Sequence, residues 1–216
     1  MKKIIYITAL LSFLLSCKSE RKQNDAEQTA IPEVKLSKLE QLYLLPTDSV
    51  LDFYDLSNDS ITEFPDLSAY RIRSLDLSYN LIDINLIDEI VLALFPQGIE
   101  VLNLSNNKLN DDLFIGSLKY KAEINDSFTL KEVDISYNKL NELATGLSLY
   151  RIIASHNDLT YVSVNYTNVQ YLDISYNPNL SNKVNFWHNK IDTIVRVGIA
   201  NDKPLEGPIH LRAITD

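Results

Sequence analysis

Apolar and polar residues follow one recurring pattern through the middle of the chain. In a unit of eleven residues, apolar side chains occupy positions 1, 4, 6 and 11, and position 9 is usually asparagine. Clear copies span residues 72–82, 99–109, 130–140 and 149–159. Looser copies span residues 51–61, where Asp59 replaces the asparagine, and residues 169–180, which have one extra residue after Asn177. Because six copies share one phase, the chain is predicted to coil into stacked repeats.

Each copy predicts one short strand. Leu75 and Leu77 flank Asp76, so the strand points its leucines into the repeat and the residue between them outward. No copy can bury its leucines alone, and stacking the copies builds a parallel sheet. The recurrent asparagine is expected in the bend after the strand, where its amide can satisfy unpaired backbone groups. Asp59 can accept such bonds but cannot donate them when ionised, so the first copy is expected to be less regular.

This pattern, L-x-x-L-x-L-x-x-N-x-L with aliphatic substitutions, resembles the signature of the leucine-rich-repeat family. The resemblance covers residues 51–180. It implies an α/β solenoid, a right-handed superhelix with a concave parallel β-sheet and mostly short irregular or helical convex segments. Position 9 falls at residues 59, 80, 107, 138, 157 and 177. The steps from residue 80 to 107 and from 107 to 138 are the two long ones, and they therefore predict longer convex segments.

The segments between copies are expected to differ. Residues 83–95 have apolar positions spaced for a helix, which would end before Pro96 and Gly98 on the convex side. The insertion at residues 110–129 also has helical potential, with a loop near its end. The short steps leave room only for extended segments or tight helical turns.

Residues outside the repeats predict caps at both ends. Residues 31–50 are interpreted as an N-terminal cap or a degenerate repeat. Residues 181–216 are interpreted as a C-terminal cap that begins with a last strand near Ile191 to Val197. Covering is expected because exposed sheet edges invite pairing with other chains.

The first thirty residues predict a leader and a tether. Lys2 and Lys3 precede an apolar run that is too short to cross a bilayer, which needs about 20 residues, so residues 1–16 are interpreted as a signal peptide. Residues 14–17, Leu-Leu-Ser-Cys, resemble the lipobox of bacterial lipoproteins, which implies acylation of Cys17; an ordinary cleaved signal is the alternative. Lys18 differs from the aspartate that retains enteric lipoproteins in the inner membrane, which implies the outer membrane. Residues 17–30 then form the lipidated cysteine and a disordered tether. Whether the protein faces the periplasm or the cell surface stays open.

Charge and composition exclude several functions. The chain has 20 basic and 29 acidic residues, and removing residues 1–16 would leave 18 − 29 = −11. Nucleic acid is excluded as a partner because phosphate binding needs a basic surface. The three histidines lack metal-ligand spacing, and the five glycines form no phosphate-binding pattern. The sequence therefore predicts no enzyme, no cofactor and no metal, and a small-molecule substrate is not expected.

Stacking in register predicts three columns of side chains. The column between the two inward positions contains Asp55, Asp76, Asn103, Asp134, Ile153 and Asp173. Carboxylates about 4.8 Å apart repel and raise one another's pKa unless a cation or donor intervenes, so a basic partner is one hypothesis and local pairing is the other. A serine column follows, for which a structural role is expected because no base recurs beside it. The third column contains Asn58, Tyr79, Asn106, Tyr137, His156 and Tyr176. Its tyrosines either contact a partner or merely cover the edge of the sheet.

The sequence thus predicts a lipid-anchored envelope protein, attached to the membrane through Cys17, whose repeat surface binds another protein. The candidate contact residues are Tyr79, Tyr137, Tyr176, Asp76, Asn103, Asp134, Asp173 and His156. A passive structural component of an envelope complex and a surface adhesin for host protein or glycan are the alternatives.

Overall fold

The computed structural model describes residues 35–63, 65–83, 98–115, 129–146, 148–164, 168–180, 184–185, 190–199 and 212–214. Residues Leu36–Asp216 belong to one compact unit. The predicted signal peptide, Cys17, the predicted tether, nearly all of the predicted helix at residues 83–95 and much of the predicted C-terminal cap lie outside the described residues. In the described part of the chain, no helix is both long and apolar enough to cross a membrane.

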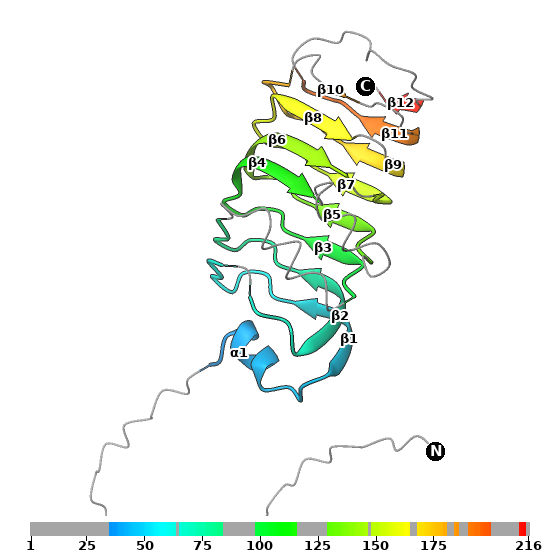
Figure 1. Cartoon of the computed structure of the whole chain (residues 1–216). Coiled ribbons are helices and arrows are strands. Elements are labelled where there is room, and N and C mark those ends of the chain that lie inside the picture. Colours follow the sequence, from blue (N-terminus) through cyan, green and yellow to red (C-terminus); the bar gives the residue numbers. More distant parts are fainter. Residues whose placement is uncertain are drawn as a thin grey trace, which may run out of the picture. The chain divides into compact units, whose positions relative to one another are not determined.

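The chain winds into stacked coils, and the strands of successive coils form two parallel sheets (Figure 1). The long sheet has the order β1-β2-β3-β5-β7-β9-β11-β12, and the short sheet has the order β10-β8-β6-β4. The long sheet consists of β1 (Ser49–Asp55), β2 (Tyr70–Asp76), β3 (Val101–Asn103), β5 (Glu132–Asp134), β7 (Arg151–Ile153), β9 (Asn168–Asp173), β11 (Lys190–Val195) and β12 (Arg212–Ile214). The short sheet consists of β4 (Asn110–Ile115), β6 (Lys139–Thr145), β8 (Tyr161–Val164) and β10 (Val184–Asn185). The fold of the described residues is therefore a parallel β-solenoid.

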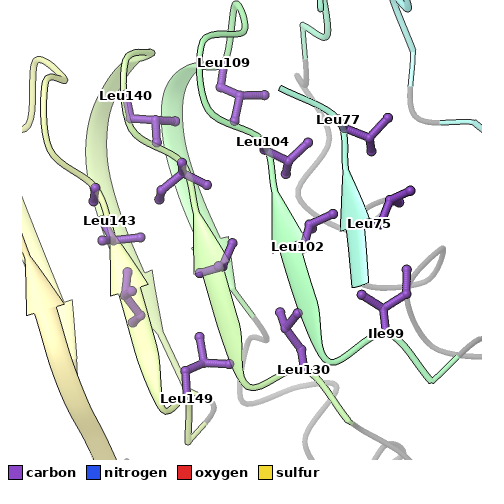
Figure 2. Packing of buried hydrophobic residues seen from close by; sticks show 14 of the residues in the cluster. Leu75, Leu77, Ile99, Leu102, Leu104, Leu109, Leu130, Leu140, Leu143 and Leu149 are labelled. Atoms are coloured by element: carbon purple, nitrogen blue, oxygen red, sulfur yellow. The ribbon is translucent and has the colours of Figure 1, made fainter. Parts of the chain in front are cut away.

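The core runs along the interior of the solenoid. Leu77, Leu104, Ile135, Ala154 and Ile174 occupy equivalent positions on successive coils and are all buried. Leu75 and Leu102, the preceding inward residues, are register partners and lie beside each other in the packed interior (Figure 2). The predicted inward and outward alternation is confirmed, because a strand that buries one face must point alternate side chains to the other.

The side of the coils opposite the long sheet differs from the expected α/β arrangement. In the described residues it carries strands, and Asn110–Ile115, predicted to have helical potential, is β4 paired with β6. Strands of neighbouring coils lie about 4.8 Å apart, whereas packed helices need about 8 to 10 Å. When each coil has a strand on both sides, the distance between neighbouring coils is the same on both sides. An extended segment also crosses its side of the coil with few residues. The helical interpretation of residues 110–115 was wrong. These residues form a strand because they pair with β6, which is distant in the sequence.

A short helix closes the N-terminal end of the described solenoid. Helix α1 (Lys38–Tyr43) begins with a capping box, in which the Glu40 N–H donates to Ser37 Oγ at 3.1 Å and the Ser37 N–H donates to Glu40 Oε2 at 2.8 Å. Such a box satisfies two of the amide groups that a helix start leaves unpaired. Leu42 faces the interior and is fully buried. α1 therefore covers the end of the core.

Candidate binding face of the long sheet

An asparagine ladder sets the register of the coils. Asn138 Nδ2 lies 3.0 Å from Ile135 O in its own coil and 3.1 Å from Leu104 O in the preceding coil. Asn138 Oδ1 accepts from the Leu109 N–H at 3.0 Å. The same pattern of contacts to the preceding coil recurs at Asn80, Asn107, Asn157 and Asn177. The predicted role of this amide is confirmed, and the ladder holds each bend over the next.

Asp59 occupies the ladder position where the repeat meets helix α1. Its carboxylate oxygens accept from the N–H groups of Lys38 at 2.8 Å and Leu39 at 2.7 Å. These amides belong to the first turn of the helix, which lacks internal acceptors and carries a partial positive charge. A side chain that only accepts hydrogen bonds is therefore suitable at position 59. The repeat has aspartate in place of asparagine here because its neighbour is the start of helix α1.

The acidic column stands in register on the outer face of the long sheet. Strand pairing aligns Asp55 with Asp76, Asp76 with Asn103, and Asn103 with Asp134. Asp134 then aligns with Ile153, and Ile153 with Asp173. Each polar member accepts from the serine N–H two residues later, at 2.8 to 3.0 Å. The column therefore has a local structural duty at the bend, which leaves the second carboxylate oxygen of each aspartate for other contacts.

A lysine of the same chain reduces the repulsion between carboxylates of the acidic column. Asp55 and Asp76 are the adjacent carboxylates, and Lys38 Nζ lies 2.8 Å from Asp55 Oδ2. The hydrogen bonds from Lys38 and Ser57 lower the pKa of Asp55 to about 2. The raised pKa that crowding alone would produce is absent at Asp55, because helix α1 supplies the cation. Further along, Asn103 and Ile153 separate the remaining carboxylates.

The serine column is structural. Ser78, Ser105, Ser136, Ser155 and Ser175 are buried. The hydroxyls of Ser136 and Ser175 donate to the aspartates two residues earlier, at 2.6 and 2.7 Å. Within the described residues, no group of three histidine, cysteine, aspartate or glutamate side chains could hold a metal ion.

The tyrosine column has an unusual backbone. Asn58, Tyr79, Asn106, Tyr137, His156 and Tyr176 have φ between 52° and 56°, in the left-handed region. Gly198 continues the column with φ of 69°. Each N–H of the column from Asn58 to Tyr176 donates to a backbone carbonyl of the next coil, which holds this geometry in place. Asparagine and glycine enter the left-handed region readily, whereas a tyrosine costs about 1 kcal/mol there.

Three rings of this column stack along the solenoid. The ring centroids of Tyr137 and His156 are 4.1 Å apart with an interplanar angle of 10°, and those of His156 and Tyr176 are 4.4 Å apart at 16°. Tyr79, whose neighbours in the column are asparagines, has 59% of its surface exposed, and Tyr137 and Tyr176 are about half exposed. The stacked rings therefore present their edges and polar tips to solvent.

Two features of the outer face were missed at the level of sequence. Position 2 of successive repeats forms a ladder of alternating charge, in which Arg73 lies 3.0 Å from Asp52 and 4.0 Å from Glu100, and Lys131 lies 2.8 Å from Glu100. Aligning the copies and comparing this column would have found it. A hollow of about 230 Å³ also lies over β3, β5 and β7. Its outward lining residues are Val101, Asn103, Glu132, Asp134, Arg151 and Ile153.

The hollow includes Asn103 and Asp134 of the predicted site. The Arg151 guanidinium lies 4.8 Å from the centre of the Tyr171 ring and so leans toward β9. The face therefore offers carboxylates, one cation and short apolar side chains within three strands, and the tyrosine column runs beyond their carboxyl ends. Comparison with protein-family models, with curated proteins and with solved structures finds no match.

Proposed function

We propose that this chain is a leucine-rich-repeat lipoprotein, anchored through a lipid on Cys17 in a bacterial outer membrane, which binds another protein on the outer face of its long sheet. Six copies of the repeat in one phase and the asparagine ladder support the family assignment. The described segments opposite the long sheet make this a form of the repeat with strands in place of helices.

One observation carries the binding role. Asn58, Asn106 and Gly198 satisfy the left-handed backbone of the tyrosine column, so the fold does not require an aromatic residue there. Tyrosines at three of the other positions cost about 1 kcal/mol each in backbone energy and remain half exposed or more. Stacking offsets part of this cost for Tyr137 and Tyr176 but not for Tyr79. A contact surface accounts for a large aromatic side chain held in this costly conformation.

The chemistry of the face favours a protein partner over a glycan. The three stacked rings offer edges, hydroxyls and an imidazole, which suit the carbonyl and carboxylate groups of a polypeptide. The carboxylates of Asp76, Asp134 and Asp173 lie beside this column and can receive basic side chains. Such mixed polar and aromatic surfaces are typical of transient protein interfaces.

The binding role is tested by replacing Tyr79, Tyr137 and Tyr176 together with asparagine, the residue that the column already uses. We expect the variant to fold with nearly unchanged stability and to lose its partner in affinity purification from solubilised membranes followed by mass spectrometry. A matched control replaces exposed Tyr150, which lies outside the column, with asparagine. Equal recovery of the same partner by the triple variant and by the parent chain would refute the role of the tyrosines.

The anchor is tested separately. Changing Cys17 to serine is expected to abolish incorporation of labelled palmitate and to release the chain from the membrane fraction. Continued labelling of the Cys17→Ser chain would contradict the lipid assignment, and the outcome does not depend on the partner.

A further inference from the structure

The first strand of the long sheet has an open edge. β1 is terminal in the strand order and, among the described residues, pairs only with β2, in parallel register from Ser49 to Asp55. A parallel strand directs backbone N–H and C=O groups to both of its sides. Figure 1 shows β1 at the end of the stack of strands, and the side of β1 away from β2 therefore presents a row of such groups. Proteins usually cover or blunt such an edge because it pairs with other chains.

Helix α1 leaves most of this edge uncovered. Lys38 Nζ bonds to Asp55 at 2.8 Å and to the carbonyl oxygen of Ser57 at 2.6 Å, and the Tyr54 hydroxyl donates to Lys38 O at 3.1 Å. These contacts hold the carboxyl end of β1 and the bend that follows it. In the described part of the chain, no hydrogen bond links α1 to the backbone of Ser49 to Phe53. The helix closes the core and leaves the strand edge available.

The side chains of this edge are unusually apolar. Val50 is 71% exposed and Phe53 is 59% exposed, and both belong to β1. Their register partners on β2 are Arg71 and Ser74, which are polar. Natural edge strands are normally protected by lysine, proline or a bulge. An exposed valine and phenylalanine on an open edge are instead the groups that an added strand would cover.

The charge ladder indicates which strand would fit. Along position 2 the signs alternate from Lys131 through Glu100 and Arg73 to Asp52, where the described ladder ends. One further strand would place its side chain beside Asp52, and a cation there would continue the alternation. Pairing with the β1 edge of a second copy is disfavoured, because it would bring Asp52 and Asp48 against the same carboxylates.

We propose that the β1 edge captures an extended segment of another protein, which adds to the long sheet as a strand with a lysine or arginine beside Asp52 and apolar side chains beside Val50 and Phe53. Added strands of this kind gain affinity from backbone hydrogen bonds and specificity from the side chains on alternate positions. This surface is separate from the tyrosine column and does not rest on the proposed function.

The test uses the purified full-length chain and fluorescent ten-residue peptides of valine and threonine with one central lysine. A second peptide carries glutamate in place of lysine, and a third carries N-methyl groups that block backbone pairing. By fluorescence anisotropy, we expect the lysine peptide to bind at least tenfold more tightly than either comparison peptide. Hydrogen exchange should slow at the amides of Ser49 to Asp55 when the lysine peptide binds.

Variants make the test specific to the edge. Asp52→Lys is expected to reverse the preference between the lysine and glutamate peptides, with Asp52→Asn giving equal binding of both. Asp158→Lys, the same substitution at an exposed aspartate that follows β7, is expected to leave the preference in place. Because the Asp52 side chain is 85% exposed, these substitutions should preserve the fold, which circular dichroism checks. Equal binding of the N-methyl peptide, an unchanged preference in Asp52→Lys, or self-association of the chain through β1 would overturn the proposal.

Discussion

Replacing Asn138 with aspartate keeps the shape of a ladder side chain and removes its hydrogen-bond donors. Asn138 Nδ2 lies within 3.0 to 3.1 Å of the carbonyl oxygens of Leu104, Ile135 and Ser136, and the residue is only 8% exposed. Aspartate can still accept from the Leu109 N–H. Its second oxygen, however, would face carbonyl oxygens in a buried site. Losing these bonds at about 1 kcal/mol each, together with burying a charge, should destabilise the fold by about 3 to 4 kcal/mol at neutral pH.

The loss should depend on pH in a defined direction. A buried carboxylate that has one N–H donor and faces carbonyl oxygens with its second oxygen has a folded-state pKa above its unfolded value of about 3.9. The part of the penalty that comes from the charge is therefore absent below that value and grows as the pH rises toward the folded pKa. Urea unfolding followed by circular dichroism at pH 7 and pH 4 should show the gap between variant and parent shrinking at pH 4. A gap below about 1 kcal/mol at pH 7, or one that stays constant with pH, would refute the assigned role of the ladder.

The reverse substitution, Asp59→Asn, is the control. Its carboxylate accepts from the amides of Lys38 and Leu39 at the start of helix α1. Asparagine would keep one acceptor oxygen and lose the charge that suits a helix N-terminus, at a cost of about 1 kcal/mol. The same pair of residues should thus have opposite preferences at positions 59 and 138, because one site offers N–H groups and the other offers carbonyl groups.

Three further outcomes follow from the outer face. The depressed pKa of Asp55 means that its pairing with Lys38 stabilises the fold above about pH 4 and that this stabilisation is lost as the pH falls toward 2. Because the side chains of Asp55 and Lys38 are 46% and 37% exposed, the effect should stay below about 1 kcal/mol. The fall in Tm from pH 5 to 2.5 should therefore be smaller in Lys38→Met than in the parent chain. Gly198→Ala should destabilise by about 1 to 2 kcal/mol in urea unfolding, because φ is 69° and the added Cβ would lie 2.9 Å from Tyr176 Cδ1; an unchanged midpoint would contradict this. Tyr137→Asn should change the unfolding free energy by less than about 1 kcal/mol, because lost stacking is offset by a residue better suited to the left-handed backbone; a loss above about 2 kcal/mol would show that the ring is needed for folding.

Local side-chain periodicity made the stacked coils predictable. Leu75 and Leu77 point inward around Asp76 because alternate positions of a strand face opposite sides. Asn138 could be placed in the bend because its amide both donates and accepts, which the turn requires. These inferences needed only neighbours within one repeat and the repetition of the pattern.

The strands of the short sheet were not predictable in the same way. β6 carries buried Leu140, Leu143 and Thr145, a spacing that does not alternate strictly. The β4 and β6 pairing also shifts register between Asp111 and Asp112. Their extended form depends on hydrogen bonds to other coils and on the narrow spacing between coils, neither of which a single segment contains. A helix was therefore expected where the stack holds a strand.

The sequence by itself determined that the chain coils, which side chains enter the core and which columns face outward, because these properties follow from a short repeat in constant phase. Only the tertiary structure decided what each outward group meets. Lys38 reaches Asp55 from the capping helix, and His156 lies between Tyr137 and Tyr176 because all three residues adopt a left-handed backbone held by the next coil. Contacts between coils join residues far apart in sequence, and backbone hydrogen bonds between neighbouring strands set their partners.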